Sequence, residues 1–155
     1  MKSSRLKPLI FLAIPLAVGG LAALFSAGSM DKFSALNQPP LSPPGWLFPI
    51  VWGILYILMG TASYIVYSSD APEISKQKAL GLYLVQLGFN FLWPILFFTF
   101  GLCTAAVLIV ILWVLILLTL LYFYRISKTA GYLIIPYLLW VTFAAYLNIA
   151  ICIIN

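Results

Sequence analysis

Long, almost unbroken runs of apolar residues follow one another along this chain, and short polar segments separate them. A helix that crosses the hydrocarbon core of a bilayer needs about 20 such residues. Five runs have that length, and they cover residues 8–28, 46–67, 79–98, 103–124 and 131–154. Transmembrane β-strands would instead alternate apolar and polar positions over about ten residues. The pattern therefore predicts an all-α membrane protein, a bundle of five transmembrane helices in a single domain of residues 1–155.

The first run has a second interpretation. Basic residues precede it, as they do in a secretory signal peptide, and removal of such a peptide would leave four helices. However, the apolar stretch is nearer to 20 residues than to the roughly 7–15 of a signal core, which favours a helix that stays in the protein.

Composition and charge agree with a membrane protein. Hydrophobic residues make up 65% of the chain and charged residues 7%, whereas soluble domains carry roughly 25% charged residues. The chain therefore has too few charges to cover a soluble globule, and the bilayer is its natural solvent.

The basic residues predict an orientation in the membrane. All but one precede the first run or lie in the connections after the second and fourth runs: Lys2, Arg5, Lys7, Lys76, Lys78, Arg125 and Lys128. Short loops rich in Lys and Arg face the cytoplasm. We therefore expect a cytoplasmic N-terminus, with the 29–45 loop and the C-terminus outside. No clustered basic face or tail exists, so membrane lipid and not nucleic acid is the expected partner of these charges.

Three of the runs carry aromatic and polar residues on one helical face, at about 100° per residue. The second run aligns Trp52, Tyr56, Met59, Ser63 and Tyr67, the third Tyr83, Gln86, Asn90, Trp93 and Phe97, and the fifth Tyr137, Trp140, Ala144, Asn148 and Asn155. Two explanations remain open. The faces could pack together with interhelical hydrogen bonds and interfacial aromatic belts, or they could line a cavity for a flat ligand.

Small residues suggest where helices approach closely. Gly81 and Gly88 lie opposite the Gln86 and Asn90 face, so they are candidates for a contact with another helix, in this chain or in a second copy. Cys103 and Cys152 lie in or beside predicted spans without metal-type spacing. We interpret them as small apolar packing residues rather than as a disulfide or a metal site.

The chain lacks the usual residues for metal binding and acid–base chemistry. It has no histidine, the commonest axial ligand of haem and a frequent metal ligand. Its acidic residues, Asp31, Asp70 and Glu73, all fall in predicted loops, so no carboxylate is available inside a span for proton coupling or catalysis. We therefore expect no metal and no cofactor. Catalysis would have to depend on tryptophan or tyrosine redox chemistry, or on light absorbed by a ligand.

The loop between the first two runs contains the sequence QPPLSPPGW at positions 38–46. Prolines fix φ and extend the residue before them, so this segment should be stiff and extended. Long loops without secondary structure are usually functional or disordered. Ser42 is a candidate cap for the second helix, and Pro49 is tolerated in the first turn of that helix.

Two long segments of the chain resemble a known family. The segments PPLSPPGWLFPIVWGILYILMGTASYIVY (39–67) and PYLLWVTFAAYLNIAICIIN (136–155) are similar to those of the tryptophan-rich sensory protein or TspO/MBR family, which includes the mitochondrial translocator (peripheral benzodiazepine receptor) proteins. The resemblance implies a five-helix bundle, often a homodimer, in this case in a bacterial cell membrane. It also implies a pocket under the first loop for tetrapyrroles such as protoporphyrin, and in some members for sterols or benzodiazepine-type ligands.

The resemblance also assigns residues to the site. Trp52 and Trp140 match the two pocket tryptophans, Asn90 a helix amide, Ala144 a small residue one turn beyond Trp140, and Pro43 a loop proline that contacts ligands. Together with the aromatic faces, this gives a predicted ligand-binding set of Phe33, Pro43, Trp52, Tyr56, Gln86, Asn90, Trp93, Tyr137, Trp140, Ala144 and Asn148.

The chain departs from the family pattern at three loop positions. Phe33 replaces a frequent tyrosine, and Gln38 and Leu41 stand where many relatives have lysine and tryptophan. No basic residue follows Tyr146, so the sterol motif of animal members is absent.

The resemblance and the aromatic faces predict a binding protein that holds a tetrapyrrole as a ligand rather than as a cofactor, with a possible role in transport or stress sensing. Trp52 and Trp140 would flank the ring and Asn90 would supply a polar contact. Two other functions remain open: a light- and oxygen-dependent porphyrin-degrading enzyme, in which Trp52 and Trp140 would be catalytic, and a passive carrier of porphyrin or lipid.

Overall fold

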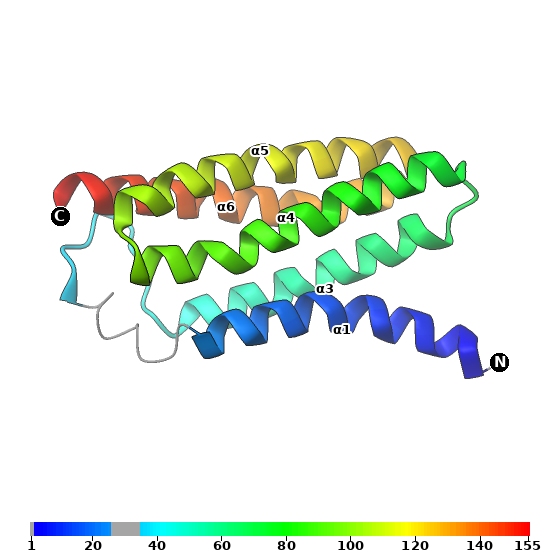
Figure 1. Ribbon diagram of the computed structural model, residues 1–155, viewed down its shortest axis with the longest axis horizontal. Helices are drawn as coiled ribbons and strands as arrows, with labels where there is room; N and C mark the ends of the chain where they lie inside the picture. Colours follow the sequence, from blue (N-terminus) through cyan, green and yellow to red (C-terminus); the bar gives the residue numbers. More distant parts are fainter. Residues whose placement is uncertain (1, 26–34) are drawn as a thin grey trace.

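The computed structural model describes residues 2–25 and 35–155, and this part of the chain forms helices joined by short connections. The helices are α1 (Lys2–Phe25), α3 (Leu47–Ser68), α4 (Glu73–Thr99), α5 (Leu102–Ile126) and α6 (Lys128–Ile154), and they run side by side along the length of the molecule (Figure 1). All five of these described helices are long and apolar enough to cross a membrane. The predicted all-α bundle of membrane-spanning helices is confirmed.

The helices extend beyond the apolar runs from which they were predicted. α4 begins at Glu73 instead of about residue 79, and α6 begins at Lys128 instead of about 131. At about 1.5 Å per residue, a helix of 27 residues such as α4 spans roughly 40 Å, which is the bilayer thickness with its headgroups included. The added turns carry the charged residues, which hydropathy alone assigns to loops.

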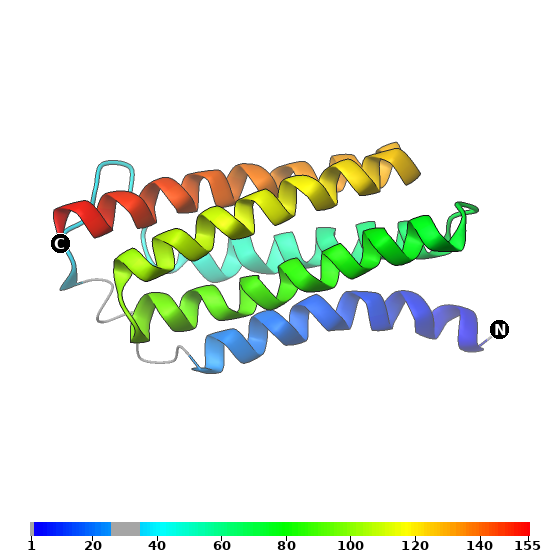
Figure 2. The ribbon, with the colours of Figure 1, turned by 45° about the horizontal axis from the view of Figure 1, so that its top comes forward.

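The helices form a closed ring in the order α1, α3, α6, α5, α4. α5 packs on both α4 and α6, α3 contacts α1 and α6, and α1 also contacts α4. α1 and α3 lie side by side in Figure 1, and α5 and α6 do so in both views (Figures 1 and 2). Large side chains such as Met59, Ile109, Phe123 and Tyr137 are fully buried between the helices.

α1 is the least buried of the described spans, and glycines bring it close to its neighbour α3. A Cβ atom on Gly60 would lie 2.7 Å from the carbonyl oxygen of Phe11 and 2.9 Å from the Cα of Leu12. A Cβ on Gly19 would overlap the ring of Tyr56. Because glycine has only a hydrogen atom as its side chain, Gly19 and Gly60 allow the two helices to approach this closely.

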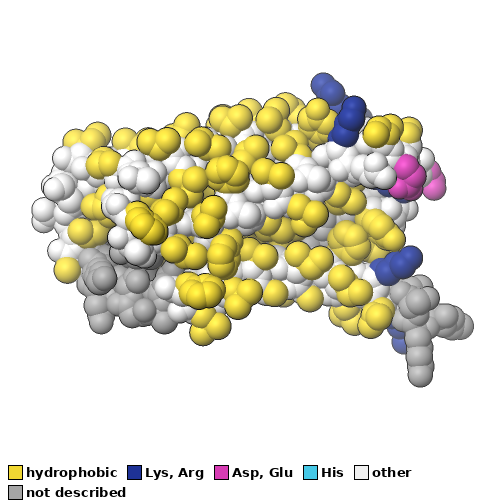
Figure 3. Space-filling view, viewed as in Figure 1, with side chains coloured by type: hydrophobic (Ala, Val, Ile, Leu, Met, Phe, Trp, Pro, Cys, Tyr) yellow, Lys and Arg dark blue, Asp and Glu magenta, His cyan; other side chains and the backbone are white. Residues whose placement is uncertain are grey.

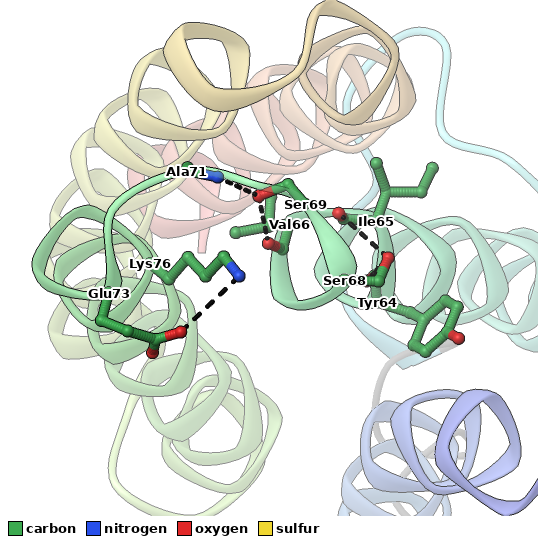
Figure 4. Close-up of polar contacts among 8 residues, drawn as sticks. All are labelled: Tyr64, Ile65, Val66, Ser68, Ser69, Ala71, Glu73 and Lys76. Atoms are coloured by element: carbon green, nitrogen blue, oxygen red, sulfur yellow. Dashed lines mark hydrogen bonds and ion pairs between the residues drawn. The ribbon is translucent and has the colours of Figure 1, made fainter. Parts of the chain in front are cut away.

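Charged side chains gather at the end of the bundle that holds the N-terminus, which we call the charged end (Figure 3). The α3–α4 connection lies there (Figure 4). Ser69 Oγ donates to the carbonyl of Val66 at 2.8 Å and accepts from the backbone N–H of Ala71 at 3.4 Å, which closes the end of α3. The Lys76 ammonium lies 3.7 Å from the Glu73 carboxylate.

A disulfide joins α5 to α6 at the opposite end of the bundle. Cys103 in the first turn of α5 and Cys152 in the last turn of α6 are bonded, with Cα atoms 5.1 Å apart. Our interpretation of these cysteines as unpaired packing residues was wrong. α5 and α6 form an antiparallel hairpin about Ser127, and the two cysteines lie at nearly equal sequence distances from that turn. The hairpin therefore places them opposite each other.

We call the described residues 35–46 the strap, and the end of the bundle where they lie the strap end. Leu47 N–H donates to the carbonyl of Pro44 at 3.1 Å, and Trp46 precedes α3 without a side-chain cap. The prediction that Ser42 caps this helix was wrong, because the turn from Pro44 to Leu47 separates Ser42 from the helix start. Ser42 Oγ is buried without a hydrogen-bond partner in the described part of the chain.

Candidate functional site

The polar residues of the predicted faces meet in the centre of the bundle. Tyr56 Oη donates to Asn90 Oδ1, Asn90 Nδ2 donates to Tyr137 Oη, and Tyr137 Oη donates to Gln86 Oε1, each at 2.7 Å. All four residues are buried. We call them the central network; it joins α3, α4 and α6. These amides are bonded between helices, which is the packing explanation for their presence in a span.

Trp52 extends the central network with an aromatic surface. Its ring stacks on Tyr56, with centroids 5.7 Å apart and planes inclined by 27°. It also meets the ring of Tyr137 edge-on at 6.2 Å. Because the tyrosine hydroxyls are fixed by hydrogen bonds, the rings that support Trp52 are fixed too.

A second polar link lies nearer the strap end. Trp93 Nε1 donates to Asn148 Oδ1, and Asn148 Nδ2 donates to the carbonyl of Leu102, both at 2.8 Å. This link ties α4, α6 and the start of α5 together. A small apolar cluster of Phe97, Ala105 and Ile151 lies at the same end, and Leu36 of the strap packs against it.

A groove of about 530 Å³ runs between α3 and α6. Its lining consists of aliphatic, proline and aromatic side chains: Val51, Ile54, Leu55, Leu58, Pro136, Leu139, Trp140 and Phe143. Ile54 and Leu139 are exposed, so the groove opens on the outer surface of the bundle, towards the membrane.

Trp140 lines this groove with its indole ring. Its ring centroid lies 5.9 Å from that of Phe48 and 5.6 Å from that of Phe143. Its Nε1 is buried and has no hydrogen-bond partner among the described residues. An indole N–H is a donor only, and this one is enclosed by protein atoms, so it presents no accessible donor to the groove.

The strap is fastened to α6 at two places. Asn155 Nδ2 donates to the carbonyl of Asn37 and Asn155 Oδ1 accepts from the N–H of Asn37, both at 3.1 Å. Tyr146 Oη donates to the carbonyl of Pro40 at 2.9 Å. From these anchors the chain passes to the start of α3 beside the C-terminal end of α6 (Figure 2). The strap thus bridges the two helices that form the groove.

The exposed side of the strap is apolar. Leu41 has a positive φ of 72° and is 80% exposed, and Trp46 is also exposed. A residue other than glycine rarely adopts this left-handed conformation, and Leu41 does so within a proline-rich segment. The strap also lines an open hollow of about 550 Å³, to which Pro43 contributes.

Comparison with known proteins identifies the chain. The profile of the TspO/MBR family matches residues 11–154, which include nearly all of the described helical bundle. The chain belongs to the TspO/MBR family.

Relatives of this TspO/MBR chain are similar over most of their length. It is 39% identical to the Tryptophan-rich protein TspO of Chlorobaculum tepidum, over 93% of this chain and 96% of that protein. The Tryptophan-rich protein TspO of Archaeoglobus fulgidus is also 39% identical, over 90% and 91%. The Translocator protein of Bos taurus is 34% identical, over 89% and 83%. The resemblance inferred from the sequence motifs is confirmed.

The predicted site residues of this TspO/MBR protein fall into separate groups. One group is the central network with Trp52 stacked on it. A second is the hydrogen-bonded pair of Trp93 and Asn148. Ala144 is buried in the hydrophobic core between the helices. Trp140 lines the groove, and its ring contacts that of Phe48, whereas the ring of Trp52 stacks on Tyr56. Pro43 lies in the strap. Phe33 lies outside the described residues.

Sequence reasoning missed the aliphatic lining of the groove and the anchors of the strap. Val51, Ile54 and Leu139 have no signal of their own, because apolar side chains fill every span. Asn155 follows the last residue of α6, where hydrogen-bond partners outside the helix are to be expected. Tyr146 lies more than two turns before that end, and its position in the sequence gives no such signal.

Proposed function

We propose that this TspO/MBR-family membrane protein binds a flat, apolar, weakly acidic small molecule of the tetrapyrrole class, and that the groove between α3 and α6 is the binding site. The observation that supports this most is an apolar groove that the aromatic side chains of Trp140 and Phe143 help to line. Ligand sites are commonly apolar clefts of about 300–1,000 Å³ with few polar groups, and the groove of about 530 Å³ is within that range.

The side chains in and beside the groove suit a flat conjugated ring. Trp140, Phe143 and Phe48 offer ring faces and edges, and aromatic contacts contribute about 0.5–1.5 kcal/mol beyond the burial of apolar area. The groove lining and the strap contain no cationic side chain among the described residues. Recognition would therefore rest on stacking and burial, with the acidic groups of the ligand directed to water beside the strap.

The departures at Gln38 and Leu41 fit this mode of binding. Relatives that carry lysine and tryptophan at these positions could pair with a ligand carboxylate from the loop. In this chain the strap keeps its prolines and its anchors on α6, and it presents amide and apolar side chains instead.

Porphyrin titration in the dark tests the proposal. The solubilised full-length protein is titrated with protoporphyrin, and the porphyrin absorbance band is followed so that loss of a tryptophan does not alter the readout. We expect Trp140→Ala to raise Kd about tenfold or more, because stacking and apolar burial worth about 1.4 kcal/mol are lost. Trp52→Ala should have a smaller effect, since its ring stacks on Tyr56.

Trp113→Ala is the matched control. Trp113 Nε1 donates to Thr142 Oγ1 at 2.7 Å between α5 and α6, away from the groove. This variant should keep the affinity of the native protein. Unchanged affinity for protoporphyrin in Trp140→Ala would rule out the groove as the binding site. An equal loss of affinity in Trp113→Ala would also rule it out. Repeating the incubation under light with and without oxygen separates binding from porphyrin degradation.

A further inference from the structure

Three links at the strap end converge on the last turns of α6. The disulfide holds Cys152 to the start of α5, Asn155 holds the strap at Asn37, and Tyr146 holds it at Pro40. The ring of Tyr146 lies 6.3 Å from that of Phe143, which lines the groove. The end of α6 therefore connects the disulfide with the segment that bridges the groove.

The last turn of α6 depends on the disulfide more than the preceding turns do. Asn148 and Ile151 are buried and bonded or packed against α4 and α5. Beyond Ile151, in contrast, Ile153 is 76% exposed and Ile154 and Asn155 are exposed too. Helix ends fray because their final carbonyls lack partners within the helix. The Cys103–Cys152 bond is a covalent restraint at the exposed end of α6.

We propose that the Cys103–Cys152 disulfide is a thiol-exchange site that determines how firmly the strap is held across the end of the groove. With the bond intact, the last turn of α6 is fixed and Asn155 clamps Asn37. When the bond is reduced, that turn frays, the clamp opens, and the strap stays attached through Tyr146. The effect on the strap does not depend on the proposed ligand, whereas a faster exchange of ligand rests on the proposed function.

The reaction is an ordinary exchange with a dithiol reductant. A thiolate of the reductant attacks one sulfur of the protein disulfide, a mixed disulfide forms, and the other cysteine leaves as a thiolate. The second thiol of the reductant then displaces the first cysteine. Two electrons and two protons pass to Cys103 and Cys152, and the reductant becomes a cyclic disulfide. Cys103 is exposed and Cys152 half-buried, so the bond is accessible to a small dithiol.

Hydrogen exchange of the full-length protein tests the effect on the strap. Samples with the bond intact and samples reduced by dithiothreitol are compared, and thiol titration confirms each state. The amide of Asn37 is itself a donor to Asn155, so its exchange reports on the clamp directly. We expect exchange at residues 36–38 and 152–155 to accelerate by about tenfold on reduction, with no change across residues 130–147.

Two variants control for indirect effects of the reductant. Cys103→Ser with Cys152→Ser should exchange as fast as the reduced native protein, with or without dithiothreitol. Asn155→Ala should give fast exchange at Asn37 even when the disulfide is intact. Equal exchange at Asn37 in verified oxidised and reduced samples would overturn the proposal, and so would an acceleration spread evenly over α4, α5 and α6.

The release of bound protoporphyrin provides the second readout. Reduction should speed dissociation several-fold, and Tyr146→Phe should speed it further because it removes a second hydrogen bond between the strap and α6. If exchange at Asn37 responds and dissociation does not, the link to ligand release is wrong. If protoporphyrin fails to bind in either redox state, the proposed function fails while the hydrogen-exchange result still decides the effect on the strap.

Discussion

Single side chains in the bundle centre join helices that are distant in sequence. Asn90 uses both halves of its amide, since Oδ1 accepts from Tyr56 and Nδ2 donates to Tyr137. A carboxylate could not donate and an aliphatic residue could do neither. The amide at this one position therefore orients two tyrosine rings, and through Tyr56 it also orients the stacked ring of Trp52.

Replacing Asn90 tests the central network. Asn90→Leu removes both hydrogen bonds and leaves the buried hydroxyl of Tyr56 without its acceptor. Interhelical hydrogen bonds in membranes average about 0.6 kcal/mol each, and a buried unsatisfied group costs more. We expect the free energy of unfolding to fall by about 1–2 kcal/mol, measured by loss of helicity in mixed micelles.

Thr61→Ala is the control for this substitution. The Thr61 hydroxyl is exposed and donates at 2.8 Å to the carbonyl of Ile57 in the same helix, so it links no second helix. Its removal should leave the stability nearly unchanged. If Asn90→Leu proved as stable as Thr61→Ala, the network would carry no net stability.

The elements of the bundle are held by different means. α5 and α6 are joined by a short turn, a large apolar contact and a disulfide. α1 buries much less of its surface and depends on its close approach to α3 at Gly60. Small residues matter in membranes because lipid is as apolar as the side chains, so dispersion contacts between backbones must replace the hydrophobic effect.

A pair of glycines on α3 tests how α1 is held. Gly60→Ala places a methyl group against the α1 backbone at Phe11 and Leu12, and backbone cannot move aside as a flexible side chain can. We expect a loss of about 1–3 kcal/mol in stability and a lower Tm. Gly53→Ala is the control, because open space surrounds its Cβ position and alanine is the better helix former. A Tm for Gly60→Ala equal to that for Gly53→Ala would contradict this account.

Charge is distributed unequally over the whole molecule. The described basic side chains lie at the charged end, and the strap end carries the disulfide instead. Basic loops face the cytoplasm, and disulfides persist in oxidising compartments outside it. Two independent chemical preferences therefore favour the same orientation.

Reporter fusions test that orientation. An alkaline phosphatase domain joined after Asn155 should be active, because that enzyme folds only outside the cytoplasm, whereas a fluorescent protein inserted at Ala71 should fluoresce inside the cell. The reverse pattern, with the reporter after Asn155 active only as a cytoplasmic enzyme, would show that the orientation predicted from the basic residues is wrong.

The amount that could be predicted from the sequence differs between these scales. The inward position of Gln86 and Asn90 follows from helical periodicity and from the cost of an unpaired amide in lipid. Their partners do not follow, because periodicity gives a direction around one helix and says nothing of its neighbours. The groove was missed because Ile54 and Leu139 resemble any lipid-facing residue. The disulfide was missed because Cys103 and Cys152 are far apart in the sequence. They come together only because α5 and α6 fold back on each other at Ser127. The proposed contact of Gly81 and Gly88 with a second copy stays a prediction; both are exposed, with open space at their Cβ positions among the described residues.

The bond between Cys103 and Cys152 also has a consequence for biogenesis. It connects the beginning of α5 with the last turn of α6, so it cannot form until α6 has been synthesised and inserted. During translation Cys103 cannot form this bond until Cys152 has been synthesised, 49 residues later. The oxidised form is therefore reached only after α5 and α6 have both been synthesised and have paired as a hairpin.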